Sequence, residues 1–290
     1  MTIPTFVLRV YAALGIMLCA FAFGFHKKNF KYFMVFTILT TLGLNIGYFI
    51  NGVPNSMASF VGLFDPLDNL GTENDPEGTH KGLVPCRDGN NSCSVWDEDV
   101  YPLHPSWAVA LYDRFASGSQ TRRNVLYAHI FFNTLAFVLM NVQFLSDELG
   151  KRLRYHKYTG RLAFVSLTIG SCMALWMGSE HSDVPEYGGM AVVFGWFWMV
   201  TLMWGSAAIG VYKAYIKDFE GHRTWMIRAL GATWGAFWLY RIMLLVLGPI
   251  FRNHEPLVFQ FPTWLSVPGG ILIAELLFRY IGKKPLIKRD

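Results

Sequence analysis

Charged residues are scarce in this sequence. Asp, Glu, Lys and Arg together make up 16% of the 290 residues, whereas apolar residues make up 53%. An ordinary soluble domain has about 25% charged residues, because it needs a charged surface around its core. The low charge therefore argues against a soluble fold.

Lys and Arg are also missing from alternate loops. Residues 179–187 contain neither, and residues 248–261 contain only Arg252. The other short connections and the C-terminal tail carry the basic residues: Lys27, Lys28, Lys31, Lys151, Arg152, Arg154, Lys157, Lys213, Lys217, Arg223, Lys283, Lys284, Lys288 and Arg289. Retained positive charge marks the cytoplasmic or matrix side of a membrane. The net charge of +5 is thus a topology signal rather than a nucleic-acid footprint, and it predicts an outer N-terminus and an inner C-terminus.

The apolar residues come in blocks of about 20, the length of helix that crosses the hydrocarbon core of a bilayer. Seven blocks are present: 5–24, 32–51, 124–145, 159–178, 188–212, 225–247 and 262–281. The first lacks a basic start and a clear cleavage site, so we interpret it as a retained helix. The sequence predicts an all-α polytopic membrane helix bundle with about seven transmembrane helices. Plasma membrane, endomembrane and mitochondrial inner membrane all satisfy this pattern.

Several kinds of catalytic motif are absent. The sequence contains no HExxH, GxSxG or P-loop pattern and none of the dense histidine boxes of membrane di-iron oxygenases. No predicted span has an interior lysine for a retinal Schiff base. These absences leave the isolated histidines and the charged residues of the spans as the chemical leads.

The one long outer loop covers residues 52–123 and is acidic. It contains Cys86 and Cys93, which we predict to form a disulfide because the outer side is not a reducing compartment. Between them, Asn90 begins an Asn-Asn-Ser glycosylation acceptor. Residues 105–117 have the spacing of a helix that either lies on the membrane or packs on the bundle.

The predicted organisation has four parts. Two N-terminal transmembrane helices occupy 1–51 and the outer loop 52–123. A core four-helix region occupies 124–247, and a C-terminal transmembrane helix with a basic tail occupies 248–290.

Four histidines lie near the two membrane faces. His129 and His181 are near the outer face, and His156 and His222 are near the inner face. One imidazole on each axial side of the iron holds a b-type haem, and such sites form between the helices of a bundle. We therefore predict that these four histidines bind metal as haem b, one haem on each side of the membrane. The alternative is that they are helix caps or contacts to lipid headgroups.

Charge inside a predicted span is costly, and three of the charged residues in the predicted spans are candidates for a role. Glu275 and Arg228 lie at similar depths, which predicts an ion pair that is either structural or part of a proton or quinone site. Arg241 shares a predicted helical face with Trp234 and Trp238. It either makes a cation–π contact with them or binds an anionic group such as a haem propionate or a lipid phosphate.

The later spans carry a set of motifs over residues 124–245. His129 opens the third span, and Val142-Gln143-Phe144 stands near its end. An HxxxGR motif runs from His156 to Arg161, an HRxWMxR motif runs from His222 to Arg228, and Arg241 completes the set. This combination resembles the DUF2306 family of predicted membrane proteins. The resemblance implies a helical membrane bundle and, by itself, no activity.

The layout is also similar to that of the cytochrome b561-like and ferric-reductase-like haem bundles, in which histidines on successive helices point inward. The likeness implies a haem at each pair of histidines, with Arg161, Arg228 and Arg241 near propionates or a quinone. The sequence departs from that pattern because His156, His181 and His222 fall at or beyond the predicted helix ends.

Three functions remain open. The first is transmembrane electron transfer through b-type haem. The second is a non-catalytic accessory or structural subunit of a larger membrane complex, which binds lipids and partner subunits. The third is transport or proton conduction through Glu275 and the polar residues of the third span.

Overall fold

The computed structural model describes residues 15–16, 18–26, 30–69, 115, 119–148, 155–179, 189–250 and 255–281. These residues form helices and no strand, which confirms the all-α prediction. The helices are α2 (Lys31–Asn69), α4 (Gln120–Glu148), α5 (His156–Ser179), α6 (Gly189–Tyr215), α7 (Phe219–Trp234), the π-helix η2 (Gly235–Leu239), α8 (Tyr240–Ile250) and α9 (Glu255–Ile281).

Five of the described helices are long and apolar enough to cross a membrane. Their spans are Lys31–Val53, Gln120–Ser146, His156–Ser179, Met190–Tyr215 and Leu257–Arg279, and each matches a predicted span. The predicted span 225–247 lies in the continuous helical run of α7, η2 and α8. The predicted span 5–24 lies largely outside the described residues. The total of seven spans and the orientation in the membrane therefore stay predictions.

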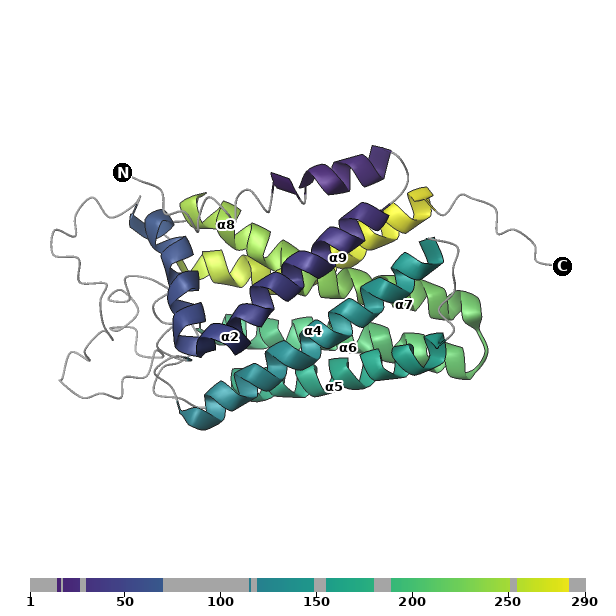
Figure 1. Cartoon of the computed structure of the whole chain (residues 1–290), viewed down its shortest axis with the longest axis horizontal. Helices are drawn as coiled ribbons and strands as arrows, with labels where there is room; N and C mark the ends of the chain where they lie inside the picture. Colours follow the sequence, from purple (N-terminus) through teal and green to yellow (C-terminus); the bar gives the residue numbers. More distant parts are fainter. Residues whose placement is uncertain are drawn as a thin grey trace.

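Four helices form the centre of the bundle. α4 packs on α5, α5 on α6 and α6 on α7, and α7 also contacts α4. α5 and α7 are thus diagonally opposed across this group (Figure 1). α2 covers α4 and α8, while α9 packs on α6, α7 and α8. The helices alternate in direction. Following the charge prediction, we call the end at which α5 and α7 begin the inner end, and the other end the outer end.

α2 changes direction at Gly52. This residue has a φ of 79°, in the region that only glycine adopts without steric cost. Pro54 follows two residues later and disfavours an α conformation in the residue before it. The membrane-spanning part of α2 therefore ends at this bend.

The helices α7 and α9 cross at very short range. Gly231 and Gly235 face Gly270 so closely that a Cβ on any of the three would overlap the backbone of the opposing helix. Small residues at such crossings let helix backbones pack tightly in a membrane. The crossing also brings Arg228 and Glu275, which lie on its inner side, within bonding distance.

The π-helix η2 corrects one prediction. The predicted cation–π contact of Arg241 with Trp234 or Trp238 does not occur among the described residues, and a π-helical turn, which adds about one residue to the α-helical period, lies between Trp234 and Arg241. The guanidinium of Arg241 instead lies over the ring of Phe237, at 4.4 Å from its centroid. The indole of Trp234 donates to Asn141 Oδ1 at 3.0 Å.

Candidate functional site

The inner histidines face each other across the bundle. His156 is the first residue of α5, and His222 lies in the first turn of α7. Their ring centroids are 6.4 Å apart, and their planes are nearly perpendicular, at 89°. α7 begins at Phe219, before the predicted span, so His222 lies inside its helix and not beyond the end as the sequence suggested.

The distance between the two ring centroids can be compared with that of two histidines bound to one metal. Imidazoles that coordinate one metal from opposite sides, each through a nitrogen at about 2.0 Å, have centroids about 6 Å apart. The inner pair meets this spacing although α5 and α7 are not neighbours in the ring of four helices. The separation of the two inner rings is therefore close to that of a two-imidazole axial site.

The first turn of α7 is held by a cap and by the preceding turn. Asp218 Oδ1 accepts a hydrogen bond from the Gly221 backbone at 2.8 Å, and the Asp218 carboxylate pairs with Lys213 Nζ at 2.9 Å. The pKa of the Asp218 carboxyl is lowered by the hydrogen bond from Lys213, by the hydrogen bond from the Gly221 backbone N–H and by the positive charge of Lys213. These contacts fix the start of α7 and hence the position of His222.

His222 is oriented by a backbone carbonyl. Its Nδ1 lies 2.8 Å from the carbonyl oxygen of Gly210 on α6. When Nδ1 donates to this oxygen, the proton is on Nδ1 and the lone pair is on Nε2, which is the usual arrangement of a metal-binding histidine. A Cβ at Gly210 would collide with the side chain of Met226 on α7. The glycine thus permits the close approach that the hydrogen bond needs.

The outer histidine His129 has the same kind of partner. Its Nδ1 lies 3.1 Å from the carbonyl oxygen of Gly170 on α5 and 3.0 Å from Asn133 Nδ2. The buried Asn133 Oδ1 has no hydrogen-bond partner. Turning this amide over places its oxygen against a protonated Nδ1, which is consistent with Nδ1 also donating to the Gly170 carbonyl. His129 then also presents the lone pair of Nε2.

Some predicted residues lie outside the part of the chain that the structure describes. His181, the predicted outer partner of His129, is one of them. The predicted disulfide of Cys86 with Cys93 and the glycosylation site at Asn90 are others. Within the described ranges, no group of three or more His, Cys, Asp or Glu side chains gathers into a metal site. A bis-histidine haem site requires only two.

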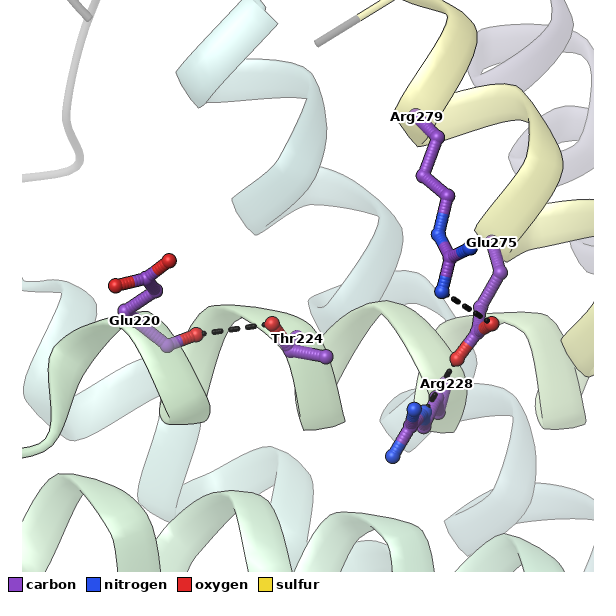
Figure 2. A network of polar contacts seen from close by, with 5 residues as sticks. All are labelled: Glu220, Thr224, Arg228, Glu275 and Arg279. Carbon is purple, nitrogen blue, oxygen red and sulfur yellow. Dashed lines mark hydrogen bonds and ion pairs between the residues drawn. The ribbon is translucent and has the colours of Figure 1, made fainter.

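The predicted intramembrane ion pair is present (Figure 2). Arg228 Nε donates to Glu275 Oε1 at 2.5 Å, and Arg279 Nη2 donates to Glu275 Oε2 at 3.3 Å. The Arg228 guanidinium also lies over the ring of Trp225, at 4.4 Å from its centroid. Glu220 stays apart from this cluster, and its carbonyl accepts from the Thr224 hydroxyl on the same helix. Two guanidiniums therefore share one carboxylate, and the cluster keeps a net positive charge.

The remaining predicted arginines differ in surroundings. Arg161 is exposed on α5, just over one turn from His156. Arg241 lies deep in the outer half of the bundle, where its Nη1 donates to the Phe237 carbonyl at 2.5 Å. The structure thus places Arg161 near an inner histidine, and the printed contacts of Arg241 are with Phe237 in the other half of the bundle.

The sequence analysis missed the two glycine carbonyls. For the inner site a signal exists, because Gly210 and His222 stand six residues on either side of Ile216, in the turn between α6 and α7. Antiparallel helices joined by a short turn place such positions at equal depth. Gly170 and His129 lie on α5 and α4, whose connecting loop is longer. Their relative depth in the bundle therefore cannot be predicted by counting residues from the loop.

Helices of membrane-spanning length, with buried polar pairs inside and large apolar side chains exposed on the outside, define an integral membrane helix bundle. The chain matches the family described as predicted membrane protein (DUF2306) over residues 126–278, more than half of its length, and it belongs to that family. The match contains the described histidines of both sites and continues into α9, where it includes Glu275. No curated protein and no solved structure matches the chain.

Proposed function

We propose that this protein transfers electrons across the membrane through b-type haem, with His156 and His222 as the axial ligands at the inner end. The observation that carries the proposal is the pair of imidazoles 6.4 Å apart on diagonally opposed helices. Caps and headgroup contacts, the alternative for these histidines, do not require two rings to meet across the bundle.

The residues present fit a haem in their donor chemistry. Nδ1 of His222 is engaged by Gly210, which leaves Nε2 as the metal-binding nitrogen. Haem supplies an iron that accepts and releases one electron. The protein would hold the two imidazoles in place and surround them with apolar helices that exclude water. At the outer end, His129 is oriented in the same way by Gly170, and His181 is its predicted partner.

Two arginines are placed to neutralise propionates at the inner end. Arg161 follows His156 on α5 and is exposed. Arg228 donates a hydrogen bond from Nε to Glu275, and its two terminal guanidinium nitrogens have no hydrogen-bond partner among the described residues. Arginine binds carboxylates with these terminal nitrogens as a planar fork. We assign both residues as candidate propionate or quinone contacts.

Visible spectroscopy tests the proposal. The full chain would be expressed with added haem precursor, purified in detergent and measured in the oxidised and dithionite-reduced states. We expect a Soret band, sharp reduced bands and low-spin ferric signals of bis-histidine haem. His156→Ala and His222→Ala should each remove about one haem equivalent, whereas His26→Ala, an exposed residue outside the family match, should remove none. Wild-type protein without a Soret band or bound iron would refute the proposal.

A second candidate is an accessory subunit of a larger membrane complex. Exposed tyrosines ring the inner end beside basic residues, with Tyr158 at 67% and Tyr215 at 83% exposure next to Lys157 and Lys213. Aromatic and basic residues at this level bind lipid headgroups or partner subunits. Native electrophoresis of mildly solubilised membranes is the test, and migration as a free monomer alone counts against this role.

A further inference from the structure

The cluster of Arg228, Glu275 and Arg279 has one more positive than negative charge. Arg228 Nε lies 2.5 Å from one oxygen of the Glu275 carboxylate, and Arg279 Nη2 lies 3.3 Å from the other. The carboxylate stands between the two guanidiniums (Figure 2). Two positive charges and one negative charge leave a single positive charge unbalanced within the cluster. The cluster is therefore suited to one further anion of single charge.

The guanidinium of Arg228 is held in place and still has donors to offer. Nε donates to Glu275, and the guanidinium lies over the ring of Trp225, at 4.4 Å from its centroid. Its two terminal nitrogens have no hydrogen-bond partner among the described residues. The side chain is 30% exposed, so a ligand at the surface of the bundle can reach it. Two parallel N–H donors of this kind match the oxygens of a phosphate.

The cluster lies where α9 reaches the membrane boundary. The span in α9 ends at Arg279, and Glu275 precedes this end by four residues, which is about 6 Å of helix. The side chain of Arg279 is 75% exposed. Long basic side chains near the ends of membrane helices extend to the interface, where the lipid phosphates lie. The cluster is therefore at a depth that a lipid phosphate occupies.

An exposed apolar stripe on α9 continues from the cluster into the membrane. Leu276 and Leu272 precede Arg279 by three and seven residues, so the three side chains lie on one side of the helix. Each leucine is 58% exposed. A lipid whose phosphate binds the arginines can lay an acyl chain along this stripe. Free phosphate makes no use of the leucines, so the surface as a whole favours a phospholipid.

We propose that Arg228 and Arg279 bind the phosphate of an anionic phospholipid at the junction of α7 and α9. The terminal nitrogens of Arg228 donate to the phosphate oxygens, Arg279 adds charge at the boundary, and Glu275 holds both guanidiniums in position. Basic sites between membrane helices bind anionic headgroups on the cytoplasmic or matrix side. The proposal does not rest on the haem function. It is an alternative to a propionate or quinone as the ligand of Arg228, because the same two nitrogens cannot serve both at once.

Native mass spectrometry of the full chain tests the site. The protein is purified in detergent, depleted of lipid and mixed with equal amounts of phosphatidylglycerol and phosphatidylcholine that have the same acyl chains. Phosphatidylcholine has the phosphate without the net charge, so the ratio of single lipid adducts measures selectivity for the anionic headgroup. A second arm repeats the measurement with inorganic phosphate equimolar to the lipid. The variants are Arg228→Gln, Arg228→Lys, Arg279→Gln and, as a control, Lys217→Gln, which removes a positive charge from an exposed turn at the same end of the bundle.

Wild type should favour phosphatidylglycerol by about fivefold or more, the factor expected for one arginine near an anionic headgroup. Arg228→Gln should bring the ratio close to one, and Arg279→Gln should lower it by less because this side chain is more exposed. Arg228→Lys keeps the charge without the fork and should keep part of the selectivity. This variant carries the test if Arg228→Gln does not fold. Lys217→Gln should match wild type.

A ratio of one in wild type overturns the proposal, and so does an equal loss of selectivity in Lys217→Gln and Arg228→Gln. Full displacement of phosphatidylglycerol by equimolar inorganic phosphate would also overturn it, because the site would then bind phosphate without the lipid. Haem content of the same variants separates the site from the proposed function. A chain that binds no haem but selects phosphatidylglycerol through Arg228 keeps the site and loses the function. A fall in haem content in Arg228→Gln with unchanged lipid selectivity does the reverse.

Discussion

The three-residue cluster at the inner end allows a quantitative prediction. Glu275 bonds to Arg228 at 2.5 Å, with side-chain exposures of 21% and 30%, and to Arg279 at 3.3 Å, where the arginine is 75% exposed. The first pair is short and largely shielded, and the second is mostly in solvent or among headgroups. Exposed pairs contribute about 0.2–1 kcal/mol, whereas removing one partner of a fully buried pair costs about 3–5 kcal/mol.

We expect the Glu275–Arg228 coupling to lie between these limits, at about 1–2 kcal/mol, and the Glu275–Arg279 coupling to be below about 0.5 kcal/mol. Two double-mutant cycles measure them, with Glu275→Gln combined in turn with Arg228→Gln and Arg279→Gln. The readout is the free energy of unfolding in mixed detergent micelles, obtained by titration with dodecyl sulfate.

The two coupling energies should also respond differently to salt. Adding salt should reduce the Arg279 coupling more than the Arg228 coupling, because solvent-exposed charges are screened and shielded ones are not. Equal couplings in the two cycles, or a larger value for Arg279, would refute the view that burial and distance decide the strength of this network.

Three further predictions concern single residues. Gly210→Ala brings a Cβ within 2.8 Å of the Met226 sulfur, so that this side chain or α6 must shift, and the Soret absorbance expected of the proposed haem should fall, while Gly205→Ala, which meets open space, leaves it unchanged. Asn141→Leu leaves the indole N–H of Trp234 without its acceptor. This substitution should lower the free energy of unfolding by about 0.5–1.5 kcal/mol, measured by dodecyl sulfate titration. Asp218 has a lowered pKa because Lys213 binds its carboxylate. Its contribution to stability is therefore full above the ordinary Asp pKa and is lost as pH falls through the folded value. Asp218→Asn should flatten the fall in Tm between about pH 5 and about pH 3.

Each of these has a result that contradicts it. Unchanged haem content in Gly210→Ala would mean that the proposed site does not depend on the close packing of α6 on α7 at this glycine. Stability gained by Asn141→Leu would mean that the indole finds another acceptor. A steep acid fall of Tm in Asp218→Asn, equal to that of wild type, would locate the titrating group elsewhere.

The helices of the bundle were predictable because they depend on length and apolar content alone. The ion pair of Arg228 with Glu275 was predictable for a related reason. Both residues lie at the same depth from the same membrane face, and an unpaired charge in a span is costly. These inferences need only position along a helix and the cost of burial, and the structure contains both features.

Other features of the structure could not be predicted from the amino-acid sequence. The π-helical turn between Gly235 and Leu239 has an ordinary composition, yet it changes which ring lies beneath Arg241. The packing of α2 on α8 brings together two helices that lie far apart in the sequence. Such contacts depend on the rotation of each helix about its axis, which packing decides and residue periodicity alone does not.

The glycine carbonyls of the candidate sites have a consequence for how such sites are recognised. A backbone oxygen cannot be removed by substitution, so the contacts of Gly170 and Gly210 with the Nδ1 atoms of His129 and His222 depend on helix spacing and not on a side chain. A search for a carboxylate beside each histidine would pass over both sites. Their detectable mark is a glycine on the neighbouring helix, at the same depth, whose carbonyl oxygen lies within hydrogen-bond distance of the histidine Nδ1.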